Sequence, residues 1–283
     1  MYIHRQPFLG SEAFDSGLVR KHELRRDYVL LFPDVYLHRD VTPTLTHRAR
    51  AAWLWSHREG VLAGLTASAM HGAKWVDDAL PVEVIWPNAR RPEGLRTYDY
   101  RLHQDEYTSV ADMRITTVTR TAFDIGRRRS FLDAVCRLDA LGNATRFDVD
   151  DVLALAKRHR GARRVRQLVA ALAIHDAGAE SPKETWLRLV LLDAGFPRPR
   201  TQIPVLGVNG RARYYLDMGW DDVSVAVEYD GEHHRTDRAS YRHDIIRMEY
   251  LQSLRWRVVR VTADDRAPDI VRRVHAARTP RLL

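Results

Sequence analysis

The strongest constraint on the fold of this chain is a C-terminal segment, 215–234, that places carboxylates inside two predicted β-strands. In residues 223–230, valine and tyrosine alternate with smaller or acidic residues, and this period of two is typical of a strand. Glu228 and Asp230 are therefore expected on one face, and Asp217 lies in the preceding strand. Buried carboxylates are costly unless they are paired or bound to a metal. The acidic residues of this segment therefore either belong to a specific site or point to solvent at the edge of the hairpin.

A tight turn between the two strands would bring these acids together. If Asp221–Asp222 is a two-residue hairpin turn, Asp217 pairs with Ala226 and shares a face with Glu228. The two carboxylates are then diagonal neighbours, about 7–8 Å apart at the backbone. Mg²⁺ suits such a pair, because it accepts one or two carboxylates and keeps several waters. The alternative is a solvated hairpin edge with outward acids, and the pattern alone does not separate the two.

Composition favours a nucleic-acid partner. The chain has 283 residues, which suits two domains, and a formal net charge of +8. Most of its positive charge is arginine, because Lys21, Lys74, Lys157 and Lys183 are the only lysines. Arginine offers phosphate a forked pair of donors, so nucleic acid is the expected class of partner. The single cysteine, Cys136, excludes an internal disulfide and a cysteine-rich zinc site.

The sequence contains no evident targeting or membrane segment. Its first residues lack the apolar core of a signal peptide. No stretch approaches the roughly 20 apolar residues that span a bilayer. We therefore expect a cytoplasmic protein without a membrane partner. The sequence leaves the oligomeric state open, with a homodimer as one option.

Residues 1–45 are predicted to form a small winged-helix-like DNA-binding unit. Residues 11–27 favour one or two short helices, and 29–38 favour two strands around the Pro33–Asp34 turn. The alternative is an ordinary basic helix on a packed α+β domain, since helix-turn-helix spacing is weakly specific. The predicted recognition helix carries four basic residues that would contact DNA: Arg20, Lys21, Arg25 and Arg26.

Residues 46–175 predict an α+β domain that ends in a basic helix. The pattern is helical over 46–72, with 65–72 as a second helix that Gly72 stops. His71 and Asp124 are expected as caps or satisfied core residues. The densest basic run, 157–166, would either follow a phosphate backbone or form a solvated helix face. Its candidate DNA-binding residues are Arg158, Arg160, Arg163, Arg164 and Arg166.

Residues 176–283 predict a third domain in which a helix precedes several strands. Ser181, the proline after it and Glu184 form a capping box, so a helix begins there. A strand at 202–205, the hairpin at 213–230, a helix at 240–254 and a strand at 256–262 follow. The order is helix, strands, helix, strand, and the whole chain is expected to be of the α+β (α/β) class.

This order with strand acids resembles the restriction-endonuclease-like PD-(D/E)xK superfamily, with its αβββαβ core. Within it, the chain is most similar to the DUF559 group, which is related to the very-short-patch repair endonucleases. The resemblance covers about residues 180–265, and the superfamily lysine of the third strand is replaced by Asp230. The matching pieces are Asp217, then 227–234, then Asp244 with Arg247, then 255–260.

The upstream region is similar to the AbiEi-type module of type IV antitoxins and related regulators. The matching pieces are 32–36, 66–72 and 118–124. This resemblance implies that the N-terminal winged helix binds DNA.

The nuclease resemblance implies roles for individual residues. Asp217 would be a Mg²⁺ (or Mn²⁺) ligand, and Glu228 a second ligand or the group that orients the attacking water. His234 would move a proton, with His233 as a neighbouring substitute. Glu184 would reach the metal, although its capping role explains the same residue equally well. The supporting residues are Asp230, Asp244 and Arg247.

We therefore expect a metal-dependent DNA endonuclease or nickase that its N-terminal module targets to DNA. A second hypothesis is a DNA-binding regulator or antitoxin-like protein whose nuclease fold does not cut. A third is a nuclease directed at RNA.

Overall fold

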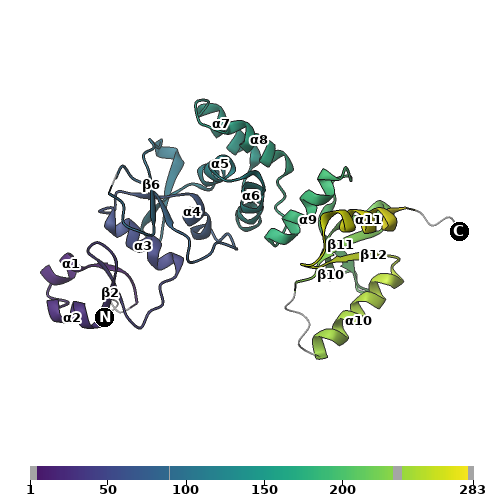
Figure 1. The fold of residues 1–283 in the computed structure, drawn as a ribbon, viewed down its shortest axis with the longest axis horizontal. Helices are drawn as coiled ribbons and strands as arrows, with labels where there is room; N and C mark the ends of the chain where they lie inside the picture. The colour runs from purple at the N-terminus through teal and green to yellow at the C-terminus, as the bar shows by residue number, and fades with distance from the viewer. Residues whose placement is uncertain (1–4, 89, 232–237, 280–283) are drawn as a thin grey trace. The chain divides into compact units, whose positions relative to one another are not determined.

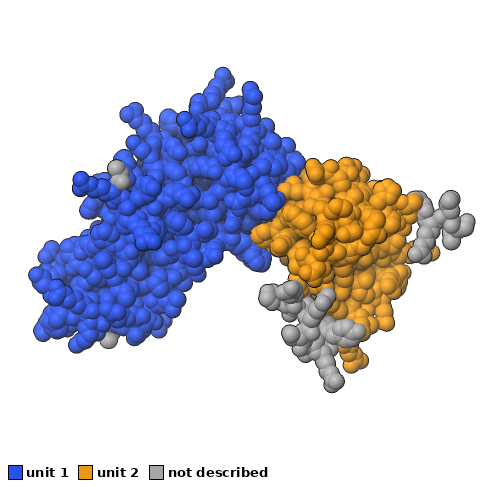
Figure 2. Space-filling view, in the orientation of Figure 1, with its two compact units in different colours: residues 1–175 blue, residues 176–283 orange. Residues whose placement is uncertain are grey.

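The computed structural model of the chain describes residues 5–88, 90–231 and 238–279, side chains at 238–241 excepted. Helices and three sheets are mixed (Figure 1), so the predicted α+β class is confirmed. The chain divides into two compact units, 1–175 and 176–283 (Figure 2), and this division coincides with the predicted start of the C-terminal domain. Within the described residues, no helix combines the length and apolar character needed to cross a bilayer.

The first unit begins with two short helices and a hairpin. Its sheet has the strand order β1-β3-β2, and the predicted turn at Pro33–Asp34 joins the hairpin strands. Phe32 and Val35 belong to the same core cluster as Leu45 and Leu62, so these elements share an apolar core with the rest of the unit. The elements are β1 (Phe8–Leu9), α1 (Gly10–Asp15), α2 (Lys21–Asp27), β2 (Tyr28–Phe32) and β3 (Val35–His38).

The remainder of the first unit contains a five-stranded sheet of order β6-β5-β4-β8-β7 and six helices that the described residues form. The strands are β4 (Val61–Leu62), β5 (Val82–Ile85), β6 (Leu95–Tyr98), β7 (Tyr107–Val110) and β8 (Met113–Thr116), with a 3₁₀ turn η1 (Gln104–Glu106). The helices are α3 (Leu45–Trp55), α4 (Gly64–Met70), α5 (Val118–Arg128), α6 (Phe131–Thr145), α7 (Val149–Arg158) and α8 (Val165–Ile174).

The two helices expected within 46–72 are present as α3 and α4, and the short strand β4 that interrupts the helical pattern between them was not predicted. Gly64 explains the interruption, because its φ of +54° lies in the left-handed region and a Cβ there would meet the Glu83 carboxylate. The change from strand to helix at this position therefore requires a residue without a side chain.

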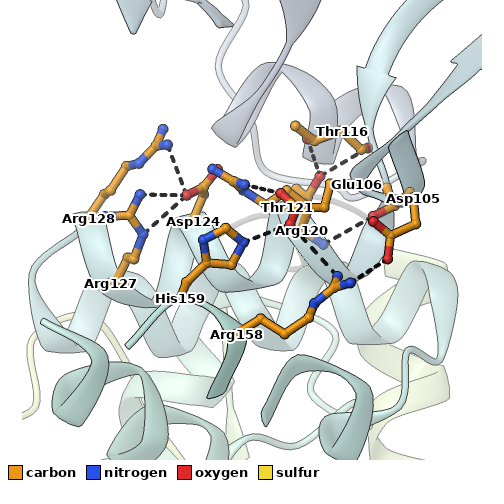
Figure 3. A network of polar contacts seen from close by, with 11 residues as sticks. Asp105, Glu106, Thr116, Arg120, Thr121, Asp124, Arg127, Arg128, Arg158 and His159 are labelled. Carbon is orange, nitrogen blue, oxygen red and sulfur yellow. Dashed lines mark hydrogen bonds and ion pairs between the residues drawn. The ribbon is translucent and has the colours of Figure 1, made fainter. Parts of the chain in front are cut away.

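A buried ionic network joins α5 to η1 and α7 (Figure 3). Arg120 pairs with Asp124 at 2.9 Å and with Glu106, and all three side chains are at most 3% exposed. Arg127 donates a second hydrogen bond to Asp124 at 2.9 Å. The prediction that Asp124 is a satisfied core residue is confirmed. His71 contacts the Thr116 carbonyl at 2.8 Å, which confirms the same prediction for that side chain.

The second unit is a four-stranded sheet of order β12-β11-β10-β9 with helices on both faces (Figure 1). α9 and α11 pack on one face and α10 on the other. β11 is parallel to β12 and antiparallel to β10. The elements are α9 (Pro182–Asp193), β9 (Arg200–Leu206), β10 (Ala212–Trp220), η2 (Asp221–Val223), β11 (Val225–Tyr229), α10 (Arg238–Ser253), β12 (Arg257–Val261) and α11 (Ala267–Arg278).

The turn of the acidic hairpin differs from the prediction. Trp220 pairs with Val225, so the connection spans 221–224 rather than two residues, and Ser224 adopts a φ of 49°. Ala226 consequently pairs with Gly219 rather than with Asp217. The register is shifted by two residues, and since side chains alternate with a period of two, Glu228 and Asp230 keep their predicted face.

Candidate functional site

A pocket of about 320 Å³ opens at the end of β11 where the acidic residues meet. It brings together most of the residues that the sequence predicts for the site. His233 and His234 lie outside the described residues. The pocket is lined by Asp217, Glu228, Tyr229, Asp230, His243, Asp244, Arg247 and Arg260.

Asp217 lies where the alternation of β10 breaks. Leu216 packs with Ala226 beneath α10, whereas Met218 packs with Val227 on the opposite face. In a regular strand residues two apart share a face, so the backbone twists at Asp217. The Asp217 carboxylate Oδ2 accepts the backbone N–H of Tyr229 at 2.9 Å. The side chain therefore points across toward β11, and it lines the pocket.

The environment of Asp217 disfavours its charged form. Burial raises its pKa to about 7, and the carboxylates of Glu184 and Glu228 act in the same direction. The Tyr229 N–H and the Arg247 guanidinium oppose this effect. At neutral pH, binding of either a proton or a cation would therefore stabilise the Asp217 carboxylate in this environment.

Glu228 is fixed by an arginine of α10. It is 6% exposed, and Arg247 donates to both of its oxygens, with Nη1 3.0 Å from Oε2 and Nη2 in contact with Oε1. The same Nη2 reaches the Tyr215 carbonyl at 3.0 Å. A forked pair of this kind neutralises a buried carboxylate and holds it in one orientation. Arg247 thus holds Glu228 in place, and its supporting role in a catalytic site stays a prediction.

The carboxylate of Glu184 forms hydrogen bonds at the N-terminus of α9. Ser181 Oγ donates to Glu184 Oε1 at 2.8 Å and the Glu180 N–H donates to Oε2 at 3.0 Å. The Ser181 side chain also accepts the Glu184 N–H, so the predicted N-cap is confirmed. The Glu184 carboxylate reaches back to the N–H of Glu180, one residue before the N-cap position of the predicted capping box. Burial raises the pKa of Glu184. The side chain does not line the pocket, but its charge is close enough to raise the pKa of Asp217.

Three residues that line the pocket were not predicted as site residues: Tyr229, His243 and Arg260. Arg260 on β12 is aligned with Glu228 on β11, and His243 lies one helical turn before Arg247 on α10. Arg260 faces Asp230 at 3.9 Å and Asp244 at 3.6 Å. The signal for His243 is its spacing of four from Arg247, which puts both on one face of a helix. The signal for Arg260 is its place at the end of the matching segment 255–260, although only the sheet brings it beside Glu228.

The donor chemistry of the pocket fits a hard divalent cation that keeps most of its water. Across 5–88, 90–231 and 238–279, no group of three or more His, Cys, Asp or Glu side chains is arranged to hold a metal. A site with one or two carboxylates suits Mg²⁺, and the raised pKa of Asp217 is what a cation would relieve. Glu228 would join directly only if Arg247 moved away from one of its oxygens.

The predicted DNA-binding residues of α2 are exposed. Arg20 precedes the helix, Arg26 pairs with Asp27 at 2.7 Å, and Lys21 lies 5.5 Å from the centre of the Phe14 ring. Lys21 and Arg25 line a groove of about 800 Å³ that α1, α2 and the β2–β3 hairpin form. The geometry agrees with the expected helix and β-ribbon arrangement, and DNA binding stays a prediction.

The basic run at 157–166 is not the predicted C-terminal helix. α7 ends at Arg158 and α8 begins at Val165, and Arg164 adopts a φ of 64°, which breaks the helix. Arg158 pairs with Asp105 at 2.6 Å and extends the network of Figure 3. The remaining arginines of the run, Arg160, Arg163, Arg164 and Arg166, are exposed around the turn.

Comparison with known proteins gives relatives without an assigned function. The chain is 28% identical over 230 residues to the uncharacterized protein Rv2248 of Mycobacterium tuberculosis strain H37Rv, and equally to the uncharacterized protein MT2308 of strain CDC 1551 / Oshkosh. The matched region covers 79% of this chain and 82% of each relative. No protein-family model matches the chain. No solved structure matches it either.

Proposed function

We propose that this protein is a metal-dependent DNA endonuclease or nickase whose active site is the pocket at the end of β11. The observation that carries the proposal is the pKa of Asp217, raised to about 7 beside the paired Glu228 in a protein with a net charge of +8. Strongly perturbed carboxylates in a cleft are typical of sites that bind a cation or do chemistry. The order α9, β9, β10, β11, α10, β12 agrees with the αβββαβ core of the nuclease superfamily that the sequence resembles.

In this proposal Asp217 holds a Mg²⁺ or Mn²⁺ ion, with Glu228 as second ligand or as the group that orients water. The ion, when bound, would lower the pKa of a water and neutralise charge on the phosphate. Arg247 orients Glu228. A histidine moves a proton between water and the leaving oxygen, and the candidates are His243 in the pocket and His234 or His233 from the resemblance.

The first unit would bring the enzyme to DNA. Its exposed cations on α2 and around the α7–α8 turn can neutralise backbone phosphates and release counterions. Such contacts carry little sequence information, so they would position the protein on the duplex. A cytoplasmic location and DNA as the partner belong to the same proposal.

Supercoiled plasmid incubated with the purified full chain and Mg²⁺ or Mn²⁺ tests this function. We expect wild type to nick or linearise the plasmid, and Asp217→Asn and Glu228→Gln to lose this activity. Asp222→Asn is the matched control, because Asp222 is an exposed acid on the turn of the same hairpin. Equal cleavage by wild type and Asp217→Asn would show that the pocket at the end of β11 is not the active site.

A DNA-binding regulator with a degenerate nuclease fold is the second candidate. It is favoured by Arg247, which occupies both oxygens of Glu228, and by Asp230 at the place of the superfamily lysine. Salt-sensitive binding of duplex DNA without cleavage in any divalent metal would support this function and exclude the first. Faster cleavage of RNA than of DNA would instead favour the RNA-directed nuclease.

A further inference from the structure

We propose that Arg260 is the phosphate-binding residue of the pocket, and that its ligand is a backbone phosphodiester of nucleic acid. The inference rests on the proposed function for its substrate class, but it assigns a role to Arg260, which ends the matching segment 255–260 and to which the resemblance gives no role. It begins with the charge of the pocket. The side chains described there include four carboxylates, which repel an entering phosphate unless cations face it.

The two arginines of the pocket are engaged to different degrees. Arg247 donates to both oxygens of Glu228 and to the Tyr215 carbonyl, and its side chain is 18% exposed. Its hydrogen-bonding capacity is directed at the protein. Removing it from Glu228 would leave a buried carboxylate without its partner, which is costly. Arg247 therefore cannot serve a phosphate without losing its structural contact.

Arg260 is held much more loosely. Its guanidinium is 3.9 Å from Asp230 and 3.6 Å from Asp244, and both distances are longer than a hydrogen bond. Its side chain is 34% exposed and lines the pocket. The two acids steer the guanidinium toward the cavity without consuming its donors. A guanidinium held in this way can bind a phosphate without breaking a hydrogen bond to the protein.

The strand register places Arg260 where a phosphate would meet the acidic site. Arg260 is aligned with Glu228 across the parallel β11–β12 pair, so both side chains leave the sheet on the same face. Its planar fork matches two phosphate oxygens, which a lysine cannot do. The guanidinium would bind the phosphodiester beside Asp217 and Glu228 and offset the charge of Asp230 and Asp244.

Arginine-specific modification with phenylglyoxal, read by peptide mass spectrometry, tests this contact in the full chain. The probe is a 20-base-pair duplex at a concentration that saturates binding by fluorescence polarisation, with Mg²⁺ and separately in EDTA. We expect the duplex to slow modification of Arg260 by about tenfold with Mg²⁺, as for one charge-assisted contact. Arg272 is the control, since it is 74% exposed on α11 and does not line the pocket. Its modification should not change.

Plasmid nicking by three variants separates the inference from the proposed function. Arg260→Lys should lose at least tenfold in kcat, because it keeps the charge but not the fork. Arg260→Gln with Asp244→Asn keeps the net charge and should lose as much, whereas Arg272→Gln should match wild type. Protection of Arg260 without nicking by wild type would refute the nuclease and keep the phosphate site. Nicking without protection, together with full activity of Arg260→Lys, would overturn the site and keep the nuclease; absence of duplex binding would overturn both.

Discussion

The raised pKa of Asp217 makes a prediction about stability that needs no assumption about catalysis. Replacing Asp217 with asparagine keeps an oxygen that accepts the Tyr229 N–H, but removes the charge that burial and two neighbouring acids disfavour. We expect Asp217→Asn to stabilise the metal-free second unit at pH 8. Residues that bind a ligand are often destabilising in its absence, so the sign of this change is diagnostic.

The magnitude and the pH range follow from linkage. The folded-state pKa of Asp217 is raised from 3.8 to about 7, so the folded state binds the proton more tightly than the unfolded state does. The penalty is therefore absent below pH 4, grows as the pH rises through this window, and is complete above pH 7. At about 1.36 kcal/mol per pKa unit its ceiling is about 4 kcal/mol. Because the side chain is only half-buried, we expect about 1–2 kcal/mol.

Hydrogen exchange of peptides from β10 and β11, measured by mass spectrometry in EDTA at pH 5 and pH 8, is the appropriate assay. It reports opening of this hairpin directly in a chain that contains two compact units. Asp217→Asn should raise the free energy of opening at pH 8 and have a smaller effect at pH 5, while Asp222→Asn should change neither. An equal effect at the two pH values, or a loss of protection at pH 8, would refute the electrostatic account of Asp217.

Three further variants test other parts of the structure. Arg247→Met should destabilise the second unit by about 3 kcal/mol, because it leaves Glu228 buried without its cation, and the same exchange experiment measures this. Arg160→Gln with Arg163→Gln should weaken duplex binding and reduce the slope of log affinity against log salt by about 2, as read by polarisation at several salt concentrations; an unchanged slope would exclude the α7–α8 turn from the interface. His243→Ala should lower the nicking rate by about 100-fold or more with unchanged duplex affinity if this histidine moves the proton, and wild-type activity would point to the histidines at 233 and 234.

The sequence predicts those parts of the site that depend on local pattern. The start of α9 is encoded within four residues: Ser181 caps the Glu184 N–H, and the Glu184 carboxylate reaches back to the Ser181 hydroxyl and the Glu180 N–H. The predicted turn of the hairpin is two residues too short, yet Glu228 and Asp230 lie on the predicted face of the sheet. The reason is the period of two: an even shift of register preserves the face, and an odd shift would have moved both acids to the other side of the sheet.

The parts that the sequence does not predict depend on contacts between distant segments. The twist at Asp217 arises because Leu216 packs beneath α10 while Met218 packs on the face of α9 and α11. Arg260 enters the pocket only because β12 returns parallel to β11 in one particular register. Both features are set by how elements pack together, and no local pattern of apolar and polar residues records them.

The charges in the pocket also suggest an order of events. The four carboxylates and two guanidinium groups described there leave two negative charges in excess when every carboxylate is ionised and His243 is neutral. A phosphate that approaches this pocket alone meets net repulsion, whereas a divalent cation meets attraction. The cation would therefore bind first, and the phosphodiester would follow it toward Arg260. On this reasoning, protection of Arg260 by duplex should be strong with Mg²⁺ and weaker in EDTA, while binding through the first unit should persist in both.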